Sequence, residues 1–489
     1  MKISEWMVQS GVPFGTSGAR GLVTAMTDAV CFAYTVGYLK HLETLGEFSP
    51  GTSVAIAGDL RPSTPSILRA CAAAIAWMKG EPVFCGFVPT PALSLYAFSR
   101  GIPSLMVTGS HIPDDRNGIK FNRAHGEFLK DDEAAMRTQD VVLPEGWFDA
   151  QGHLRTDFTL PAVTDVIADY IERYRHFFGA ASLSGLTLGI YQHSAVGRDV
   201  LVTIVEALGG KAVPLARSDV FVSVDTEAVR PEDVDLAHDW AKEGQYDAIL
   251  TTDGDSDRPL LADQKGRWIR GDVLGILAAR KLGAAAVSTP ISSNTALEAS
   301  RFVPSVRRTR IGSPFVVSAM MDAAAEGFVP SMGYEANGGF LLASNIVQDG
   351  KILRSLPTRD AVLPMLCALI AAQGCQDGLA GLLPTLPPRF TVSDRLKEIA
   401  TERSRAQLQI LRDDIPGVTN MLGFVTMCGP VTQVDETDGI RMTFKQGDII
   451  HLRPSGNAPE LRLYVEAETQ ERAEELLTQS LQNVAKWLA

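Results

Sequence analysis

The sequence predicts an α/β protein of three or four domains that ends in a smaller α+β domain. The chain has 489 residues, and about 150 residues per domain is typical of globular proteins. Short apolar runs alternate with helix-like stretches through most of the chain, which predicts crossover units and mainly parallel sheets. Toward the C-terminus this alternation gives way to a hairpin pattern followed by one helix.

The expected strands of the α/β part each lead into a loop. They lie at residues 54–57, 82–85, 105–107, 187–191 and 248–250. Helices are expected at residues 67–78 and 200–208. Ligands of such sheets bind at the carboxyl ends of the strands, so the loops that follow these strands are the places where a site is expected.

The C-terminal pattern is antiparallel. Residues 439–444 alternate with period two, and residues 449–453 follow a Gln-Gly-Asp turn, which predicts a hairpin. A helix is expected to begin after Thr469 as N-cap, because apolar side chains then recur on one helical face. The Pro/Gly-rich stretch 378–388 is the expected linker before this domain.

Composition excludes several functional classes. The 45 Lys and Arg against 57 Asp and Glu give a net charge of −12, which argues against nucleic acid or an acidic membrane as partner. There is no signal-peptide pattern and no apolar run of about 18 residues. The six cysteines are scattered without a CxxC pair, which favours reduced thiols. A cytoplasmic location is therefore expected.

The most distinctive segment is TDGDSDR at residues 252–258, directly after an expected strand. Its carboxylates at Asp253, Asp255 and Asp257 can turn toward one point, where their mutual repulsion favours a bound cation. Oxygen ligands of this kind suit Mg²⁺, and the segment lacks the glycine and glutamate that an EF-hand needs. The alternative is a solvated acidic turn.

A second loop, VTGSHIP at residues 107–113, places Ser110 beside a glycine after a strand, with Lys120 close behind. It is not the G-x-S-x-G elbow of acyl-enzyme hydrolases, because Thr108 and Ile112 occupy the glycine positions. Ser110 is therefore either a nucleophile for another kind of chemistry or a plain turn residue.

Three further loops have the composition of phosphate or sugar sites. FGTSGARG at residues 14–21 and RPSGNAPELR at residues 453–462 combine small residues with arginine, as phosphate-binding loops do. The first is not a P-loop, since no G-K-[ST] follows. GYEANGG at residues 333–339 offers a carboxylate and a carboxamide that match sugar hydroxyls. Taken alone, each loop also fits an ordinary turn.

Together and in this order, the five loops resemble those of the α-D-phosphohexomutase superfamily, most closely its bacterial phosphomannomutase/phosphoglucomutase-like members. The most specific matches are TGSH at residues 108–111 with NGIK at 117–120, and the aspartate loop. The resemblance runs from about Phe14 to the C-terminus. It implies three tandem α/β domains around a cleft plus a C-terminal α+β domain, with expected bounds 1–155, 156–262, 263–378 and 379–489.

The resemblance also implies the reaction. A phosphohexomutase interconverts hexose 6-phosphate and hexose 1-phosphate through a phosphoserine, here Ser110, and a hexose 1,6-bisphosphate that is both intermediate and activator. The phosphoserine and the three aspartates would bind Mg²⁺. Lys120 would act as acid and base and Arg20 as electrostatic support, because the pKa of free arginine exceeds 12. His111 would donate a hydrogen bond to the phosphate or serve structure alone.

The remaining matched positions are expected to bind substrate. Arg258 would lie beside the phosphoryl group. The others are Gly312 on a separate loop, Glu335 and Asn337 on the sugar loop, and Arg453, Ser455, Gly456, Asn457 and Arg462 around the phosphate that is not transferred. The hexose phosphate is the expected partner, and the chain is expected to be a monomer or a homodimer.

Three places depart from the family pattern. Ile112 replaces an asparagine, Asn337 and Gly339 replace a common serine and histidine, and Asn457 begins a changed phosphate loop. These loops touch the sugar, so its identity stays open. Mannose and glucose phosphates are favoured, and a phosphoglucosamine or acetylglucosamine-phosphate mutase is the alternative. A haloacid-dehalogenase-type sugar-phosphate phosphatase and an inactive sugar-phosphate binder are more distant alternatives.

Overall fold

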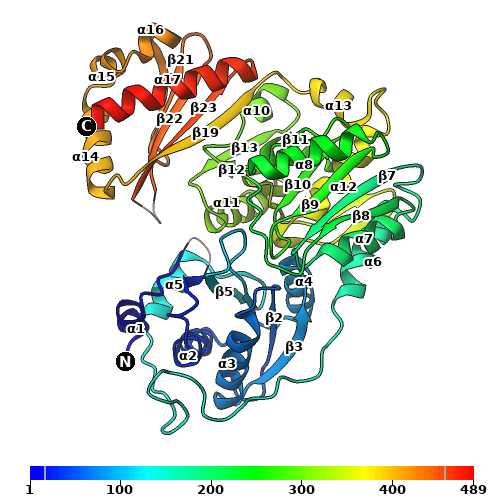
Figure 1. Ribbon diagram of the computed structural model, residues 1–489, viewed down its shortest axis with the longest axis vertical. Helices are drawn as coiled ribbons and strands as arrows, with labels where there is room; N and C mark the ends of the chain where they lie inside the picture. The colour runs from blue at the N-terminus through cyan, green and yellow to red at the C-terminus, as the bar shows by residue number, and fades with distance from the viewer. Residues whose placement is uncertain (16–17, 456–458, 489) are drawn as a thin grey trace.

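The computed structural model describes residues 1–15, 18–455 and 459–488, and the described chain forms four large sheets with helices packed on them (Figure 1). The sheets follow one another along the chain, from the blue N-terminal part to the orange and red C-terminal part. This confirms the predicted α/β class. The three α/β sheets are mixed rather than mainly parallel, because hairpin strands extend each parallel core.

The first sheet has the order β1-β5-β4-β2-β3, with β6 beside β5. Strand β2 is parallel to β3 and β4, whereas β5 runs antiparallel to β4 and β1. The expected strands at 54–57, 82–85 and 105–107 and the helix at 67–78 are confirmed. The elements are α1 Ile3–Ser10, β1 Ala19–Leu22, α2 Asp28–Thr44, β2 Ser53–Gly58, α3 Thr64–Trp77, β3 Glu81–Phe87, α4 Thr90–Arg100, β4 Ser104–Val107, β5 Arg116–Arg123, β6 Gly126–Glu127 and α5 Lys130–Arg137.

The second sheet has the order β11-β10-β9-β7-β8, and its expected strands and helix are again present. The boundary expected at residue 262 falls inside strand β10, because the β10–β11 hairpin continues this sheet to Ile269. The elements are α6 Ile167–Phe178, β7 Thr187–His193, α7 Arg198–Ala207, β8 Lys211–Arg217, α8 Pro231–Lys242, β9 Ala248–Thr252, β10 Pro259–Asp263 and β11 Trp268–Ile269.

The third sheet has the order β13-β12-β14-β15-β18, with the small β16–β17 hairpin beside it. Its elements are α9 Gly271–Leu282, β12 Ala286–Pro290, α10 Ala296–Ser300, β13 Ser305–Thr309, α11 Ser313–Ala325, β14 Ser331–Tyr334, β15 Phe340–Leu342, β16 Ile346–Gln348, β17 Lys351–Leu353, β18 Leu356–Asp360 and α12 Val362–Ala372. The expected linker at 378–388 is partly helical instead, with α13 Gly378–Leu382 and a 3₁₀ turn Leu383–Thr385, because Leu379 and Leu382 are buried.

The fourth sheet is fully antiparallel, with the order β19-β23-β22-β21-β20, and confirms the predicted α+β domain. The final helix begins where expected, since the Thr469 hydroxyl accepts the Arg472 N–H at 3.1 Å. The elements are β19 Phe390–Lys397, α14 Thr401–Asp413, α15 Ile415–Met421, α16 Phe424–Cys428, β20 Val431–Asp435, β21 Ile440–Phe444, β22 Ile449–Pro454, β23 Glu460–Ala467 and α17 Gln470–Leu488.

The cores explain how the sheets are held together. One continuous apolar core contains residues from the first three sheets, for example Met106, Leu188 and Met332. The fourth sheet has a core of its own that includes Leu463 and packs against α17. The first three sheets are therefore one packed body, to which the fourth is attached.

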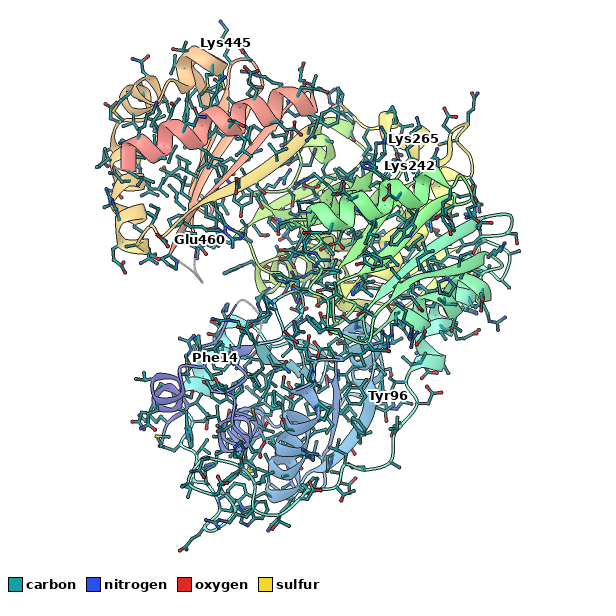
Figure 2. The ribbon with its side chains drawn as sticks, in the orientation of Figure 1. Phe14, Tyr96, Lys242, Lys265, Lys445 and Glu460 are labelled. Atoms are coloured by element: carbon teal, nitrogen blue, oxygen red, sulfur yellow. The ribbon has the colours of Figure 1, made fainter. Side chains whose placement is uncertain are left out.

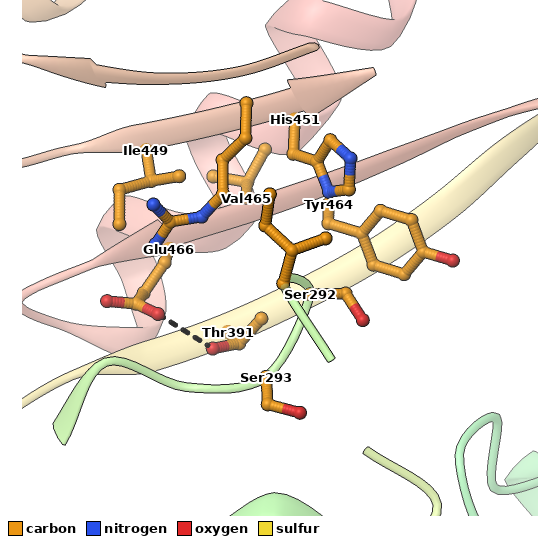
Figure 3. A pocket seen from close by; sticks show the side chains of 10 residues that line it. Ser292, Ser293, Thr391, Ile449, His451, Tyr464, Val465 and Glu466 are labelled. Carbon is orange, nitrogen blue, oxygen red and sulfur yellow. Dashed lines mark hydrogen bonds between the residues drawn. The ribbon is translucent and has the colours of Figure 1, made fainter. Parts of the chain in front are cut away.

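The fourth sheet joins the third through Glu466. Its carboxylate accepts the Thr295 N–H at 2.9 Å and Arg389 Nε at 2.6 Å. Figure 3 shows the small pocket beside this contact, with the Thr391–Glu466 hydrogen bond on one side and the stacked rings of His451 and Tyr464 on the other. No helix in the described part of the chain is long and apolar enough to cross a membrane.

Candidate active site

The aspartate loop follows β9 directly, as the sequence predicts. Asp253, Asp255 and Asp257 are at most 1% exposed, and one carboxylate oxygen of each lies within 4.8 Å of the others. Asp253 Oδ1 also accepts the backbone N–H groups of Asp257 and Arg258, both at 3.2 Å, which fixes the loop. The alternative of a solvated acidic turn is therefore wrong, because the three carboxylates are buried together.

Ser110 faces this loop. Its backbone is left-handed, with φ of 57°, and its N–H is held by Thr108 Oγ1 at 2.7 Å. Ser110 Oγ donates a hydrogen bond of 2.6 Å to Asp253 Oδ2. The two loops meet closely, since a Cβ at Gly254 would lie only 2.7 Å from the Ser110 carbonyl oxygen. A serine hydroxyl thus lies at the acidic cluster, 143 residues away in sequence.

Lys120 supplies a cation to the same cluster. It lies on β5 and pairs with Met106 of β4, the strand that leads into the Ser110 loop. This register places Lys120 near that loop. Its Nζ donates to Asp255 Oδ2 at 2.5 Å and to Asp257 Oδ2 at 2.6 Å. Thr90 Oγ1 also donates to Asp255 Oδ2, at 2.6 Å. Lysine and aspartates therefore form one buried charge cluster.

The acidic cluster fits a divalent cation. Asp255 Oδ1 and Asp257 Oδ1 are buried and have no hydrogen-bond partner, although buried carboxylate oxygens are normally paired. Burial, with the repulsion of Asp255 and Asp257, raises the pKa of Asp253 well above its ordinary value. A cation bound by these oxygens would relieve both conditions, and an all-oxygen set suits Mg²⁺.

Arg258, His111 and Arg20 form the basic side of the site. Arg258 Nη1 donates to His111 Nδ1 at 2.7 Å, and its Nε lies 3.7 Å from Asp257 Oδ1. Burial and the charge of Arg258 lower the pKa of His111 to about 2, so its imidazole is neutral at pH 7. The same two causes lower the pKa of Arg20 to about 10, which leaves it cationic at pH 7.

Arg61 is a site residue that the sequence analysis missed. Its side chain is buried and pairs with Asp59 at 2.5 Å. It also donates to the carbonyl oxygens of Ser110, at 3.0 Å, and Ile112, and it faces the Phe221 ring at 4.1 Å. Arg61 therefore holds the backbone of the serine loop in place. Its position directly after strand β2 is the signal that could have identified it.

A segment of the second unit covers the serine loop. Ser223 Oγ donates to the His111 carbonyl oxygen, and Asp225 Oδ2 lies 4.0 Å from His111 Nε2. Thr226 Oγ1 donates to the Asn337 carbonyl oxygen at 2.7 Å, so the segment reaches the sugar loop as well. This segment was not predicted to belong to the site, because it has no motif of its own.

The sugar loop adjoins the aspartate loop. Glu335 is 4% exposed, and Asn337 Oδ1 accepts the Gly339 N–H at 3.0 Å, which stabilises the turn. A second missed residue, Arg359, links the two loops through Asp257 at 3.0 Å and Glu335 at 3.1 Å. A small pocket lies between the first and third sheets, and the residues that line it include Gly18, Lys120, Asp257, Thr358 and Arg359.

The other predicted binding residues lie on separate elements. Arg453 and Arg462 are register partners on β22 and β23, so the fourth sheet places the two arginines side by side. Asp438 connects Arg453 to the third unit, because its Oδ2 accepts Arg453 Nε at 2.8 Å and the Ile311 N–H at 3.0 Å. Gly312 follows at the start of α11 with φ of 132°. Within the described part of the chain, no hydrogen bond or ion pair joins Arg453, Arg462 or Gly312 to Ser110 or to the aspartate loop.

Ser455 is buried and its N–H donates to the Glu460 carbonyl oxygen at 2.8 Å. Gly456 and Asn457 lie outside the described residues. Figure 2 shows the labelled Phe14 and Glu460 on the sides of the first and fourth units that face each other. Phe14 of the glycine-rich loop and Glu460 of the arginine loop thus lie on facing parts of the molecule.

Comparison with known proteins gives matches along most of the chain. The models described as phosphoglucomutase/phosphomannomutase alpha/beta/alpha domain I, alpha/beta/alpha domain II and C-terminal domain match residues 11–139, 168–266 and 397–481. A phosphomannomutase from Salmonella muenchen is 42% identical over 97% of this chain and 96% of its own. The chain belongs to the phosphoglucomutase/phosphomannomutase family.

Further matches agree with this family. A phosphomannomutase from Sinorhizobium fredii is 43% identical over 96% of this chain and 98% of its own. A phosphoglucosamine mutase from Anaeromyxobacter dehalogenans is more distant, at 29% identity over 63% of this chain and 70% of its own. A phosphoglucomutase/phosphomannomutase family structure from Burkholderia thailandensis, 19% identical, shares the fold over 97% of both chains with a TM-score of 0.72. The predicted superfamily and enzyme class, a phosphohexomutase, are confirmed.

Proposed function

We propose that this phosphohexomutase acts on mannose phosphate, interconverting mannose 6-phosphate and mannose 1-phosphate, and that it also accepts glucose phosphates. The observation that carries the proposal is the Ser110 hydroxyl, which donates to Asp253 within the buried aspartate cluster at 2.6 Å. The phosphomannomutase relatives at 42% and 43% identity support mannose over glucosamine, for which the cited relative is 29% identical.

The proposed reaction consists of two phosphoryl transfers, each moving a different phosphoryl group. In the first half, the bond between phosphorus and Ser110 Oγ breaks, and a bond forms to the free hydroxyl of the hexose phosphate, giving a 1,6-bisphosphate. That hydroxyl loses a proton and Ser110 Oγ gains one. In the second half the bisphosphate has turned, Ser110 takes its other phosphoryl group, and the proton returns to the sugar oxygen.

The charged residues have separate proposed roles. Lys120 is assigned the proton transfer, because its Nζ donates to Asp255 and Asp257 in the aspartate loop that Ser110 contacts. Arg20 and Arg258 are assigned charge stabilisation, because both stay cationic at pH 7. His111, neutral at pH 7, is assigned a hydrogen bond to the phosphate. A magnesium ion held by Asp253, Asp255, Asp257 and the phosphoserine would neutralise charge on the transferring group.

The phosphate that stays on the sugar is assigned to the C-terminal loop. Arg453 and Arg462 can each bind a phosphate through two N–H groups, which accepts either end of the hexose. The proposed binding residues also include Gly312, Glu335, Asn337, Ser455, Gly456 and Asn457. Movement of the fourth unit toward the serine loop would exclude water from the phosphoserine. The fold permits this movement, because the fourth unit has an apolar core of its own.

Labelling and mutation test the proposal together. The protein is incubated with Mg²⁺ and radiolabelled glucose 1,6-bisphosphate, and the labelled peptide is mapped. We expect acid-stable label on Ser110, and at least about a 1,000-fold loss of mannose phosphate turnover in Ser110→Ala. Ser66→Ala, a hydroxyl removed from α3 outside the site, is the matched control. Label on an aspartate, or unchanged turnover in Ser110→Ala, would refute the proposal.

The sugar is tested by comparing kcat/KM for mannose 1-phosphate, glucose 1-phosphate and glucosamine 1-phosphate. If kcat/KM is highest for glucosamine 1-phosphate, glucosamine replaces mannose as the assigned sugar and the reaction type stays intact.

We also propose a division into four units near the expected bounds, with the second unit extended to Ile269. The cytoplasmic location and the monomeric or dimeric state stay predictions.

A further inference from the structure

Arg359 joins two loops that have different tasks in the proposed reaction. It lies on β18 and its side chain is 4% exposed. Its Nε donates to Asp257 Oδ2 at 3.0 Å, and its Nη1 donates to Glu335 Oε2 at 3.1 Å. One rigid guanidinium thus bonds an aspartate of the metal loop and the glutamate of the sugar loop.

The sugar loop is built around this arginine. A Cβ at Gly339 would lie 2.5 Å from Arg359 Cδ and 2.6 Å from its Cγ, far inside normal contact. The Arg359 side chain therefore occupies the space into which any side chain at position 339 would project. Phe340 pairs with Asp360 across β15 and β18, so this contact is set by the sheet register.

The base of Arg359 is also fixed. The neighbouring Asp360 accepts the hydroxyl of Tyr174 at 2.7 Å and that of Tyr170 at 3.1 Å. It also accepts the Val362 N–H at 3.0 Å, which ties β18 to the start of α12. Because Arg359 lies on a strand that these contacts fix, its side chain holds its partners in place better than a side chain on a loop would.

Arg359 faces the reaction space. It lines the small pocket between the first and third sheets together with Lys120 and Asp257. Lys120 and Arg359 both donate to the same oxygen, Asp257 Oδ2, at 2.6 and 3.0 Å. The guanidinium therefore links Glu335 to the carboxylate that Lys120 also binds.

We propose that Arg359 is a positioning residue, which holds Glu335 and Asp257 in one fixed relation and so couples recognition of the sugar to the phosphoryl-transfer site. The inference rests on the proposed function, since it assigns Glu335 to the sugar. Without Arg359, Glu335 would lose its fixed orientation, and the enzyme would lose both rate and discrimination between hexoses.

A double-mutant cycle tests the coupling. The full-length enzyme is activated with glucose 1,6-bisphosphate and Mg²⁺, and kcat and KM are measured for mannose 1-phosphate and glucose 1-phosphate. The variants are Arg359→Gln, Arg359→Lys, Glu335→Gln and the double variant Arg359→Gln/Glu335→Gln. Arg472→Gln is the matched control, because it breaks an arginine–aspartate pair with Asp448 at 2.9 Å in the fourth unit, outside the site.

We expect Arg359→Gln to lower kcat/KM about 100-fold, as misplacement of a catalytic group does. The mannose-to-glucose ratio of kcat/KM should move toward one. Glu335→Gln should then add less than about threefold in the double variant, because Glu335 has already lost its position. Arg359→Lys keeps the charge without the two-pronged geometry, and we expect it to recover part of kcat but little of the sugar discrimination.

Two results would overturn the inference. One is an additive cycle, in which the two single losses multiply. The other is a sugar ratio that stays unchanged in both Arg359 variants although kcat falls. If Arg359→Gln does not fold, as judged by circular dichroism and thermal unfolding, the cycle is run with Arg359→Lys. A wild-type enzyme without turnover on any hexose phosphate would overturn the proposed function itself, which separates that failure from failure of the coupling alone.

Discussion

At the scale of single residues, backbone conformation decides where the reactive groups point. Ser110 has φ of 57°, and Ser256 in the aspartate loop has φ of 59°, although neither is glycine. Such conformations cost free energy and persist where surrounding contacts enforce them. Thr108 supplies one of these contacts to the Ser110 N–H. The strained serine lies where its hydroxyl can reach Asp253.

Gly254 provides a first prediction at this scale. A Cβ there would lie 2.7 Å from the Ser110 carbonyl oxygen, so Gly254→Ala must push the serine and aspartate loops apart. We expect kcat to fall about 100-fold, because small displacements of reacting groups have effects of that size. Steady-state kinetics with mannose 1-phosphate measures it. Gly374→Ala, with its nearest atom 3.8 Å away, is the control. Equal kcat in the two variants would contradict the prediction.

Arg61 provides a second prediction. Arg61→Met leaves the buried Asp59 without its cation and removes donors from the carbonyl oxygens of Ser110 and Ile112. Breaking a buried pair in this way costs about 3–5 kcal/mol of unfolding free energy. Urea unfolding followed by circular dichroism measures the loss. Arg175→Met breaks an ion pair whose two side chains are about half exposed, and it should cost much less. An equally small loss for Arg61→Met would refute the argument.

At the scale of elements, strand register brings distant residues into one place. Lys120 reaches the aspartates because β5 returns antiparallel beside β4, which leads into the serine loop. Arg453 and Arg462 become neighbours because β22 and β23 pair in register. The sequence analysis predicted these residues from motifs. Their juxtaposition follows from hydrogen-bond pairing between strands, which a motif does not encode.

The same hairpin predicts a pH dependence of stability. His451 on β22 is buried, donates through Nε2 to the Asp438 carbonyl oxygen at 2.6 Å, and has its pKa lowered to about 4, first by burial. An unfolded chain binds the proton below about pH 6.5, and the folded protein does so only below about pH 4. The free energy of unfolding should therefore fall as the pH drops from 6.5 to 4, by up to about 1.4 kcal/mol per pH unit from this group.

Urea unfolding at pH 4.5, 5.5 and 7 checks this prediction. His451→Gln keeps a donor for the Asp438 carbonyl oxygen and cannot titrate, so the loss of stability between pH 7 and 4.5 should be smaller in the variant. An equal loss in both proteins would show that His451 does not contribute. The exposed His153, whose side chain is 65% exposed, provides the control variant His153→Gln.

At the scale of the whole molecule, the cores divide the chain unequally. Residues of the first three sheets share one apolar core, the first unit has a second core around α2 and α3, and the fourth sheet and α17 enclose a third. Polar contacts at Glu466 and Asp438 join the fourth unit to the third. A boundary of this kind is weaker than a packed core and allows relative motion. Its own core would keep the fourth unit intact in such a motion.

Calorimetry tests this division. We expect two thermal transitions, and Leu463→Ala, which empties part of the fourth core, should lower only one of them, by several degrees. Leu188→Ala in the shared core should lower the other. Mg²⁺ alone should raise the transition of the first three units, because its proposed ligands lie there and a ligand stabilises the state that binds it. A single transition shifted equally by both variants would contradict the division.

The sequence by itself determined the α/β class, the C-terminal hairpin and helix, and the loops that carry Ser110, Lys120 and the aspartates. Each of these has a local signature: apolar periodicity for the elements, and a compact motif for each loop. The missed residues belong to no compact motif, and the local signal for Arg61 is only its position after β2. Arg359 bonds Asp257 across 102 residues, and Arg61 bonds Ser110 across 49. Only the tertiary structure decided these pairings, because burial of an arginine against a carboxylate or carbonyl depends on how separate sheets pack together.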